Sequence, residues 1–239
     1  MRLLLTFVAL LCLPYVAVAQ SLTEEEIKQL ALEAILENPQ IIMEAVALLE
    51  QQRNAEQAAA QAAVLQSQRD SKENGPNAPA VGNAEGSATI VEFFDYNCPY
   101  CKRAANDVKS LLSADNDVRV VYREWPILGE GSVFAARAAL AAREQGLYEE
   151  MHWGLMEMRG RAEEASVLAL ARSVGLDVDR LLVDMDGEEV NAHIDQSRRL
   201  AQDLGFTGTP AFVIGDALVP GAIPLSDLQG YVSEMRSIE

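Results

Sequence analysis

Two cysteines separated by two residues constrain this chain more than any other feature of its sequence. Cys98-Pro99-Tyr100-Cys101 follows the apolar run 90–94 and a short turn, and it precedes a segment with helical periodicity. A thiol at a helix N-terminus lies near unpaired backbone N–H groups and the positive end of the helix dipole, which favour the thiolate. The spacing also brings Cys101 within disulfide distance of Cys98. The motif therefore predicts thiol–disulfide exchange, with Cys98 attacking and Cys101 resolving.

The first 19 residues read as a secretory signal peptide, and the predicted location is therefore the periplasm. Arg2 precedes an apolar run that ends in small residues at Ala19, which is typical of a cleaved signal and short for a membrane span. Cys12 lies inside this segment, so the exported chain would keep only Cys98 and Cys101. Two cysteines this close in sequence close almost no chain loop, which makes them a poor structural staple and favours catalysis.

The charge of the chain narrows its partners. The formal net charge is −17, from 19 basic and 36 acidic residues, which argues against nucleic acid and anionic membranes as partners. A length of 239 residues indicates one ordinary domain with an appendage.

Residues 20–75 are predicted to form a helical arm followed by a linker. Thr23 and Glu26 form a capping-box pattern at the start of one helix, and Asn38-Pro39 separates it from a second. Apolar residues recur on these helices, four of them at seven-residue spacing: Ile27, Ala34, Ile41 and Leu48. This stripe predicts self-association, with packing onto the chain's own catalytic domain as the alternative. Beyond Glu50 the arm is rich in Ala and Gln and has little apolar surface to bury.

The catalytic domain is predicted to span residues 76–239, with the boundary near Gly75. Residues 73–87 have linker composition, and Thr89–Phe94 reads as a central strand covered on both faces. Glu92 lies on one face of this strand among apolar neighbours. The functional interpretation is a buried acid that relays a proton to or from the Cys101 thiol, and the alternative is an edge carboxylate that points to water.

The rest of the domain alternates strands with a helical region. Val118–Tyr122 reads as a strand, and residues of about 130–205 read as a helical insert with helix ends at three glycines, namely Gly146, Gly175 and Gly205. A hairpin follows, with Gly215-Asp216 as its tight turn, and Ser226 is the expected cap of the last helix.

Three elements in this order resemble the DsbA-like branch of the thioredoxin superfamily: Glu92-Phe93-Phe94, the Cys-Pro-Tyr-Cys motif, and Thr209-Pro210 beyond a helical insert. The resemblance implies an α/β, thioredoxin-like fold with a helical insert, preceded here by the N-terminal helical arm. It implies that Cys98 is exposed and that Cys101 is buried. It also implies that Pro210 is cis beside the cysteines. Substrate peptide would bind the Thr209 backbone, Pro210 and the neighbouring Pro99 and Tyr100. Glu92 occupies the family's buried-acid position.

Within that branch, the helical arm together with Cys-Pro-Tyr-Cys is similar to the ScsC-like proteins, some of which trimerise through their arms and reshuffle wrong disulfides. The best-known DsbA oxidases have His where this chain has Tyr100, and loss of that cation should make the disulfide less oxidising. The resemblance therefore favours a homo-oligomeric disulfide isomerase without a cofactor. Its partners would be unfolded or misoxidised proteins and a membrane redox partner.

Three other functions remain open at this point: a DsbA-type dithiol oxidase, a periplasmic Cu(I) carrier that uses the two thiolates, and a structural oligomer with an inert disulfide. Zinc is disfavoured, because His152 and His193 are not spaced like a zinc module and read as structural residues. No metal site is therefore predicted. An apolar client-binding surface near the cysteines is expected from three aromatic residues, Phe94, Tyr96 and Phe212, whereas Trp125, Trp153 and Tyr148 read as packing residues.

Overall fold

The structure is a computed structural model, and it describes residues 22–69, 73, 75 and 77–238. The predicted signal peptide and Cys12 lie outside the described residues. The elements follow the order α1 (Glu24–Glu37), α2 (Gln40–Ser67), β1 (Ala80–Gly82), β2 (Ala88–Phe94), α4 (Pro99–Ala114), β3 (Val118–Glu124), α5 (Glu130–Ala141), η1 (Ala142–Gln145), α6 (Tyr148–Glu157), α7 (Glu164–Ser173), α8 (Val178–Asp184), α9 (Glu188–Asp203), β4 (Ala211–Ile214), β5 (Ala217–Pro220) and α10 (Leu225–Ile238). Among the described residues, no helix is both long enough and apolar enough to cross a membrane.

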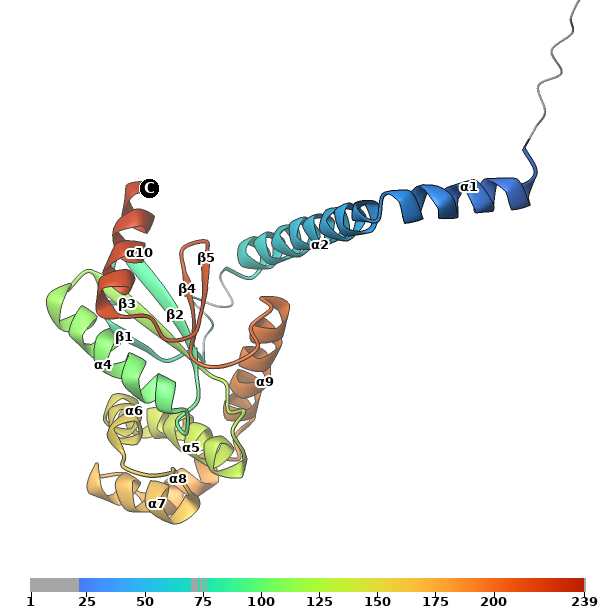
Figure 1. Ribbon diagram of the computed structural model, residues 1–239. Helices are drawn as coiled ribbons and strands as arrows, with labels where there is room; N and C mark the ends of the chain where they lie inside the picture. Colours follow the sequence, from blue (N-terminus) through green and yellow to red (C-terminus); the bar gives the residue numbers. More distant parts are fainter. Residues whose placement is uncertain (1–21, 70–72, 74, 76, 239) are drawn as a thin grey trace, which may run out of the picture. The chain divides into compact units, whose positions relative to one another are not determined.

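A five-stranded sheet with strand order β1-β3-β2-β4-β5 forms the centre of the catalytic unit (Figure 1). Strand β2 is parallel to β3 and antiparallel to β4. The edge strand β1 corrects the sequence analysis, which assigned residues 73–87 to a linker. Val81 is 6% exposed, and the Tyr122 amide donates to the Pro79 carbonyl at 2.8 Å, so this segment joins the sheet despite its turn-rich composition.

Both faces of β2 are covered, as its apolar residues on both faces predicted, and the two faces pack against different helices. Ile90 and Phe94 belong to a core that includes residues of α4, α6 and α10, whereas Val91 and Phe93 pack with residues of α9. In Figure 1, α4 and α10 lie on one side of the sheet and α9 lies on the other. Glu92 shares the face of Ile90 and Phe94 and is therefore enclosed between the sheet and α4.

The predicted helical insert is present between β3 and β4, where helices α5 to α9 follow one another. The sequence periodicity does not separate α6 and α8 as elements of their own. His152 of α6 is buried in the core. The helix ends expected at Gly146, Gly175 and Gly205 all have positive φ. The expected cap of α10 is wrong. Pro224 precedes this helix, its carbonyl accepts the amides of Asp227 and Leu228, and the Ser226 hydroxyl bonds to Asp227 instead.

The N-terminal helices begin as the sequence predicted, with a capping box in which Thr23 and Glu26 bond to each other's backbone amides. The chain divides into two compact units between Ala55 and Glu56, whereas the sequence placed the boundary near Gly75. The end of α2 belongs to the catalytic unit because Leu65 is 5% exposed in a cluster with residues of α9. The expectation that the arm has little to bury beyond Glu50 is therefore wrong at Leu65.

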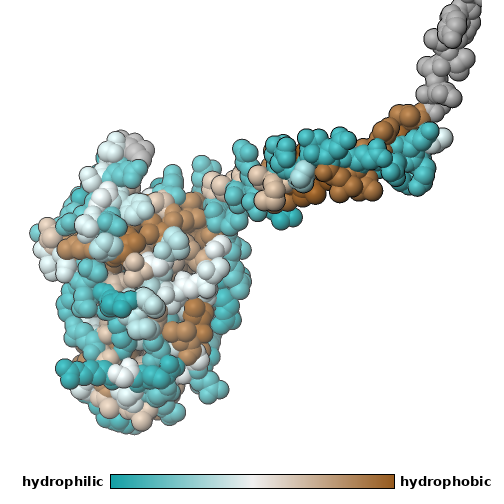
Figure 2. Space-filling model, viewed as in Figure 1, coloured by the Kyte–Doolittle hydropathy of each residue, from teal (hydrophilic) through white to brown (hydrophobic). Residues whose placement is uncertain are grey.

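The first unit exposes an unusual amount of apolar surface. Its exposed large side chains are Leu22, Ile27, Leu30, Leu32, Ile35, Leu36, Ile41, Ile42, Met43, Val46, Leu48 and Leu49. Figure 2 shows these apolar residues as a brown band along the arm helices. Contiguous exposed apolar surface of this kind marks an interaction site more often than a solvated face.

Candidate active site

Cys98 occupies the N-cap position of α4, with Pro99 as the first helical residue. Its pKa is lowered from 9.0 to about 6, although burial alone would raise it. The largest cause is a hydrogen bond from the Cys101 thiol. Bonds from the Cys101 amide, from Thr209 and from the Tyr100 amide add to it. These donors stabilise the negative charge once Cys98 ionises, so the sulfur is mostly thiolate at neutral pH.

Thr209 and Pro210 lie directly beside this thiol. The Thr209–Pro210 peptide bond is cis, as the family resemblance implied. The Cys98 Sγ donates to the Thr209 carbonyl oxygen at 3.3 Å, across 111 positions of sequence. The fold thus brings together two motifs that the sequence could connect only by resemblance.

The two cysteines are free thiols with opposite electrostatic environments. Cys101 is fully buried, and its pKa is raised by that burial and by its hydrogen bond to Cys98. Cys98 is 4% exposed, so the expectation of an exposed Cys98 is wrong. The Thr209 carbonyl lies against the sulfur, and Cys98 belongs to the hydrophobic core of the catalytic unit.

Glu92 lies in the middle of β2 and is 1% exposed, which excludes the alternative of an edge carboxylate in water. Burial raises its pKa to about 8, and the negative charge of Cys98 adds to the shift. The charge of Glu92 in turn helps to raise the pKa of Cys101. Among the described residues, its Oε1 atom has no hydrogen-bond partner. A carboxyl group with this pKa exchanges a proton readily near neutral pH.

A surface pocket of about 560 Å³ opens next to the cysteines. Tyr100, Thr209 and Pro210 line it together with Arg103 and Ile223. Tyr100 is 55% exposed, and the Arg103 guanidinium lies 4.5 Å from the centre of its ring. The pocket therefore combines the aromatic face of Tyr100 with the backbone of Thr209 and Pro210, whose carbonyls accept hydrogen bonds from Cys98 and from the Gly221 amide.

Asp95 and Asn97, which the sequence analysis left without a role, hold the loop that precedes Cys98. The Asp95 carboxylate accepts the amides of Asn97 (2.7 Å), Ile127 (2.8 Å) and Leu128 (2.9 Å). The Asn97 side chain bonds to Ser132 and to both backbone groups of Ala162. Asp and Asn in a turn before a helix commonly make such side chain–backbone bonds, which was the available signal.

Replacing Asp95 by alanine should destabilise the fold by about 3 kcal/mol, because three backbone N–H groups lose a charged acceptor. Urea unfolding measures this loss. The matched control is Asp195→Ala, which removes an exposed carboxylate paired with Arg198 at 3.7 Å and should cost less than about 0.5 kcal/mol. Equal costs for the two variants would contradict the assignment.

Several other buried polar residues of the catalytic unit are paired with one another. Tyr96 Oη and His152 Nδ1 are 3.0 Å apart, and the Tyr148 hydroxyl donates to Glu124 at 2.7 Å. The other Glu124 oxygen lies 2.6 Å from His193 Nε2. Although burial would raise the pKa of Glu124, the charge of His193 and its hydrogen bond hold that pKa below its ordinary value. Both histidines thus have structural partners.

Across the described ranges, no three His, Cys, Asp or Glu side chains are grouped so that they could hold a metal ion.

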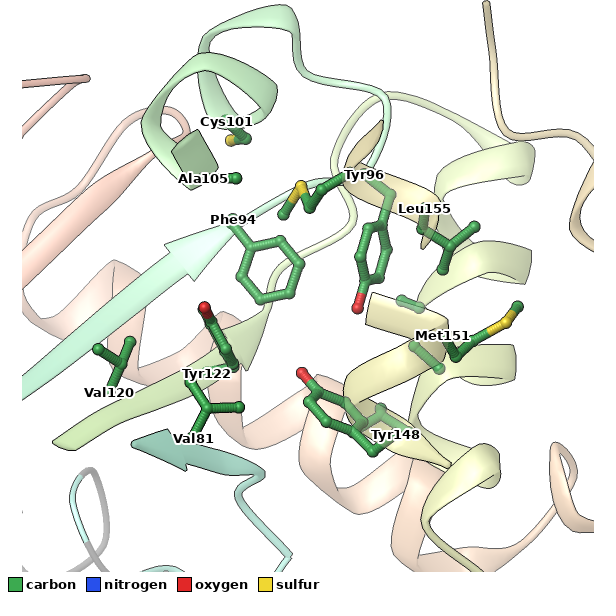
Figure 3. Close-up of a cluster of buried hydrophobic side chains, with 14 of the residues drawn as sticks. Val81, Phe94, Tyr96, Cys101, Ala105, Val120, Tyr122, Tyr148, Met151 and Leu155 are labelled. Atoms are coloured by element: carbon green, nitrogen blue, oxygen red, sulfur yellow. The ribbon is translucent and has the colours of Figure 1, made fainter. Parts of the chain in front are cut away.

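The expected apolar surface of Phe94, Tyr96 and Phe212 is wrong, because each is at most 1% exposed. These rings pack in the core instead, and Figure 3 shows Phe94 and Tyr96 among its side chains.

A family model and solved structures agree on the kind of domain. Residues 89–233 match the family model of the DSBA-like thioredoxin domain. The Na(+)/H(+) antiporter NhaA 1 of Salinispora arenicola is 30% identical over 154 residues, which are 64% of this chain and 24% of that protein. The chain spans only about a fifth to a quarter of the length of the curated antiporters that it matches.

Solved structures are similar over more of the chain. A thioredoxin-like oxidoreductase from Silicibacter pomeroyi DSS-3 is 63% identical, has a TM-score of 0.70, and covers 71% of this chain and 98% of its own. Proteus mirabilis ScsC in a transitional conformation is 29% identical, has a TM-score of 0.68, and covers 90% of this chain and 96% of its own.

Proposed function

Because the chain belongs to the DSBA-like thioredoxin domain family, we propose that it is an exported disulfide isomerase that acts on folding proteins through Cys98 and Cys101. The thioredoxin-like fold and the DsbA-like, ScsC-like resemblance predicted from the sequence are confirmed by the same comparisons. The observation that carries the proposal is the Cys98 thiol at the N-terminus of α4, 3.3 Å from the Thr209 carbonyl before a cis proline.

The proposed cycle begins with nucleophilic attack by Cys98. Its thiolate attacks one sulfur of a mispaired client disulfide, a mixed disulfide forms, and the second client sulfur leaves as a thiolate. A different client thiolate then attacks the client sulfur of the mixed disulfide, which forms a new client disulfide and returns Cys98 as a thiolate. No electrons are gained or lost overall, so the rearrangement needs neither oxidant nor reductant.

Cys101 releases the client from the mixed disulfide when the client disulfide does not rearrange. Its thiol gives a proton to the Glu92 carboxylate, and its thiolate attacks the Cys98 sulfur. The client then leaves as a thiolate, and a Cys98–Cys101 disulfide remains. The mixed disulfide removes the Cys98 charge that helps to raise the pKa of Glu92, so Glu92 ionises more readily when a base is needed. A membrane redox partner would supply the two electrons that reduce the disulfide again.

The electrostatics of Cys98 favour an isomerase over an oxidase. Its pKa of about 6 lies between the values of about 7 in thioredoxin and about 3.5 in the oxidase DsbA. When the thiol is less acidic, its thiolate stabilises the reduced form of the protein less, and the disulfide is therefore less oxidising. Tyr100, at the position before Cys101, contributes no positive charge to the thiolate. Both features support a protein that works in its dithiol form.

We assign oligomerisation to the arm on the basis of its apolar residues, which stay exposed in the part of the first unit that the structure describes. An isomerase benefits from an oligomer, since several Cys98 thiolates can then engage one client at a high effective concentration. The periplasmic location rests on the sequence of the first 19 residues.

The test uses the full chain and measures both its oligomeric state and its disulfide exchange. The arm variant replaces Ile27, Ile41 and Leu48 by serine, all of them at least 44% exposed. We expect it to become a monomer by light scattering and to lose most of its ability to unscramble a mispaired client, because its arm can no longer bury this surface. Its rate of exchange with a small disulfide should not change.

The matched control replaces three exposed polar arm residues, Glu25, Glu44 and Gln51, by serine and should remain oligomeric and active. A monomeric arm variant that unscrambles the client as fast as the unaltered chain would refute the role of the arm. Conversely, an unaltered chain that oxidises reduced clients but never unscrambles them would identify the oxidase.

A further inference from the structure

Glu92 has a cross-strand neighbour that the proposed mechanism has not used. Strands β2 and β3 run in parallel with Glu92 opposite Tyr122, and both side chains are 1% exposed. Neighbouring strands lie roughly 4.8 Å apart, and residues in register point to the same face of the sheet. The Tyr122 side chain therefore lies on the same face of the sheet as Glu92, where its ring packs on His152 of α6 with the ring centres 4.1 Å apart.

Both side chains carry a buried polar atom without a partner. Among the described residues, neither Glu92 Oε1 nor the Tyr122 hydroxyl makes a hydrogen bond. Buried polar atoms are nearly always paired, so two unpaired ones on adjacent residues call for an explanation. A hydroxyl donor and a carboxylate acceptor are complementary to each other.

The other tyrosines of the cluster already have partners. The Tyr96 hydroxyl pairs with His152, and the Tyr148 hydroxyl donates to Glu124. Figure 3 shows the Tyr122 hydroxyl pointing toward Phe94, on the side of the cluster where Cys101 lies. Tyr122 is thus the uncommitted tyrosine donor of the three.

The groups that face this pair supply no competing cation. The titratable neighbours are Cys98 and Cys101 on α4, Tyr96 before it, Glu124 on β3, and Tyr148, Glu149 and His152 on α6. Phe212 lies opposite Glu92 on β4, and α10 adds Leu228 and Val232, none of which titrates. Burial keeps His152 neutral by lowering its pKa to about 3, and Tyr122 keeps its proton because burial and the Glu92 charge raise its pKa.

We propose that Tyr122 is a positioning residue for Glu92: no hydrogen bond joins the two groups in the structure, and ionisation of the carboxyl group draws the Tyr122 hydroxyl to one carboxylate oxygen and leaves the second oxygen free to take the proton of Cys101. The inference rests on the proposed role of Glu92 as proton acceptor. A hydrogen bond to the charged form favours ionisation, so Tyr122 moderates the shift that burial imposes on Glu92. Without this hydrogen bond, the Glu92 carboxylate would form only at higher pH.

Tyr122→Phe in the full chain tests this inference, because it removes the hydroxyl and keeps the ring. A mixed disulfide between Cys98 and glutathione is prepared, and its resolution by Cys101 is followed as a function of pH. We expect the midpoint of the pH profile to move upward by about one unit, with roughly a tenfold loss of rate below the midpoint and the plateau rate retained. Tyr231→Phe, on the partly buried face of α10, is the matched control and should not move the midpoint.

Two results would overturn the inference in distinguishable ways. If Tyr122→Phe leaves the midpoint unchanged while Glu92→Gln abolishes it, Glu92 acts without Tyr122. If Glu92→Gln also leaves it unchanged, the proposed role of Glu92 fails with the inference. Should Tyr122→Phe fold poorly, the infrared band of the Glu92 carboxylate, identified by difference from Glu92→Gln, decides in the unaltered chain. A band at the frequency of a carboxylate without a hydrogen bond excludes the contact.

Discussion

Replacing Cys98 by serine is expected to reduce thiol–disulfide exchange to the rate of the uncatalysed reaction. A serine oxygen cannot form the mixed disulfide, and its hydroxyl does not ionise near neutral pH. The thiolate that is lost is an unusually abundant one. With its pKa lowered from 9.0 to about 6, Cys98 has roughly ten thiolates per thiol at pH 7, whereas an ordinary thiol has about one per hundred. The measurement is the reduction of a small disulfide substrate, together with the pH dependence of alkylation by iodoacetamide.

The second cysteine provides the matched control for this prediction. Cys101→Ser keeps the attacking sulfur but cannot resolve it, so this variant should accumulate mixed disulfides with client proteins. Alkylation of Cys98 should become half-maximal above pH 6 in this variant, since the largest cause of its low pKa is the bond from the Cys101 thiol. A profile centred near pH 9 in the unaltered chain would refute the proposed nucleophile.

The parts of the fold that the sequence predicted are those encoded by neighbouring residues. The two-residue periodicity of β2 placed Glu92 on the face of Ile90 and Phe94, and the Cys-Pro-Tyr-Cys motif placed Cys98 at the start of a helix. These features depend on periodicity and on helix-end chemistry, which act over a few residues. The turn at Gly215-Asp216 between β4 and β5 was predictable for the same reason.

The features that the sequence did not reveal depend on contacts between distant segments. Asp95 holds the amides of Ile127 and Leu128, more than thirty positions away, so its role appears only in the folded chain. The contact between the Cys98 sulfur and the Thr209 carbonyl likewise joins segments that are 111 positions apart. The burial of Leu65 was not predicted because its cluster is built from β2, β3, β4 and α9, all of them distant in the sequence. A turn before a helix indicates that Asp95 bonds to some backbone group, but no local pattern reveals partners this far away in the sequence.

Replacing Glu92 by glutamine is expected to stabilise the reduced protein strongly at alkaline pH. The unfolded chain releases this proton near pH 4.5, whereas the folded protein holds it up to about pH 8. Because the folded state binds more protons between these values, the free energy of unfolding falls as the pH rises from 4.5 to 8 and is level with respect to Glu92 outside that window. At 1.36 kcal/mol per pKa unit, the full loss is on the order of 5 kcal/mol.

Urea unfolding of both proteins between pH 4 and pH 9 measures this prediction. The two should be equally stable near pH 4, and Glu92→Gln should gain up to about 5 kcal/mol by pH 9, since glutamine has no charge to bury. Glu234→Gln, at an exposed position of α10, should follow the unaltered chain at every pH. Parallel curves for Glu92→Gln and the unaltered chain would mean that the carboxylate is solvated, and a solvated carboxylate could not serve Cys101 as proposed.

The same comparison in a Cys98→Ser background separates the two causes of the Glu92 shift. Burial is the larger cause and the Cys98 charge the smaller, so removal of the thiolate should narrow the pH window from its upper end without closing it. That narrowing is the equilibrium counterpart of the catalytic step. When the Cys98 charge disappears into a mixed disulfide, Glu92 releases its proton at a lower pH and becomes the base that Cys101 needs. A window of unchanged width would show that the two groups do not interact, and the coupling between attack and resolution would then be lost from the mechanism.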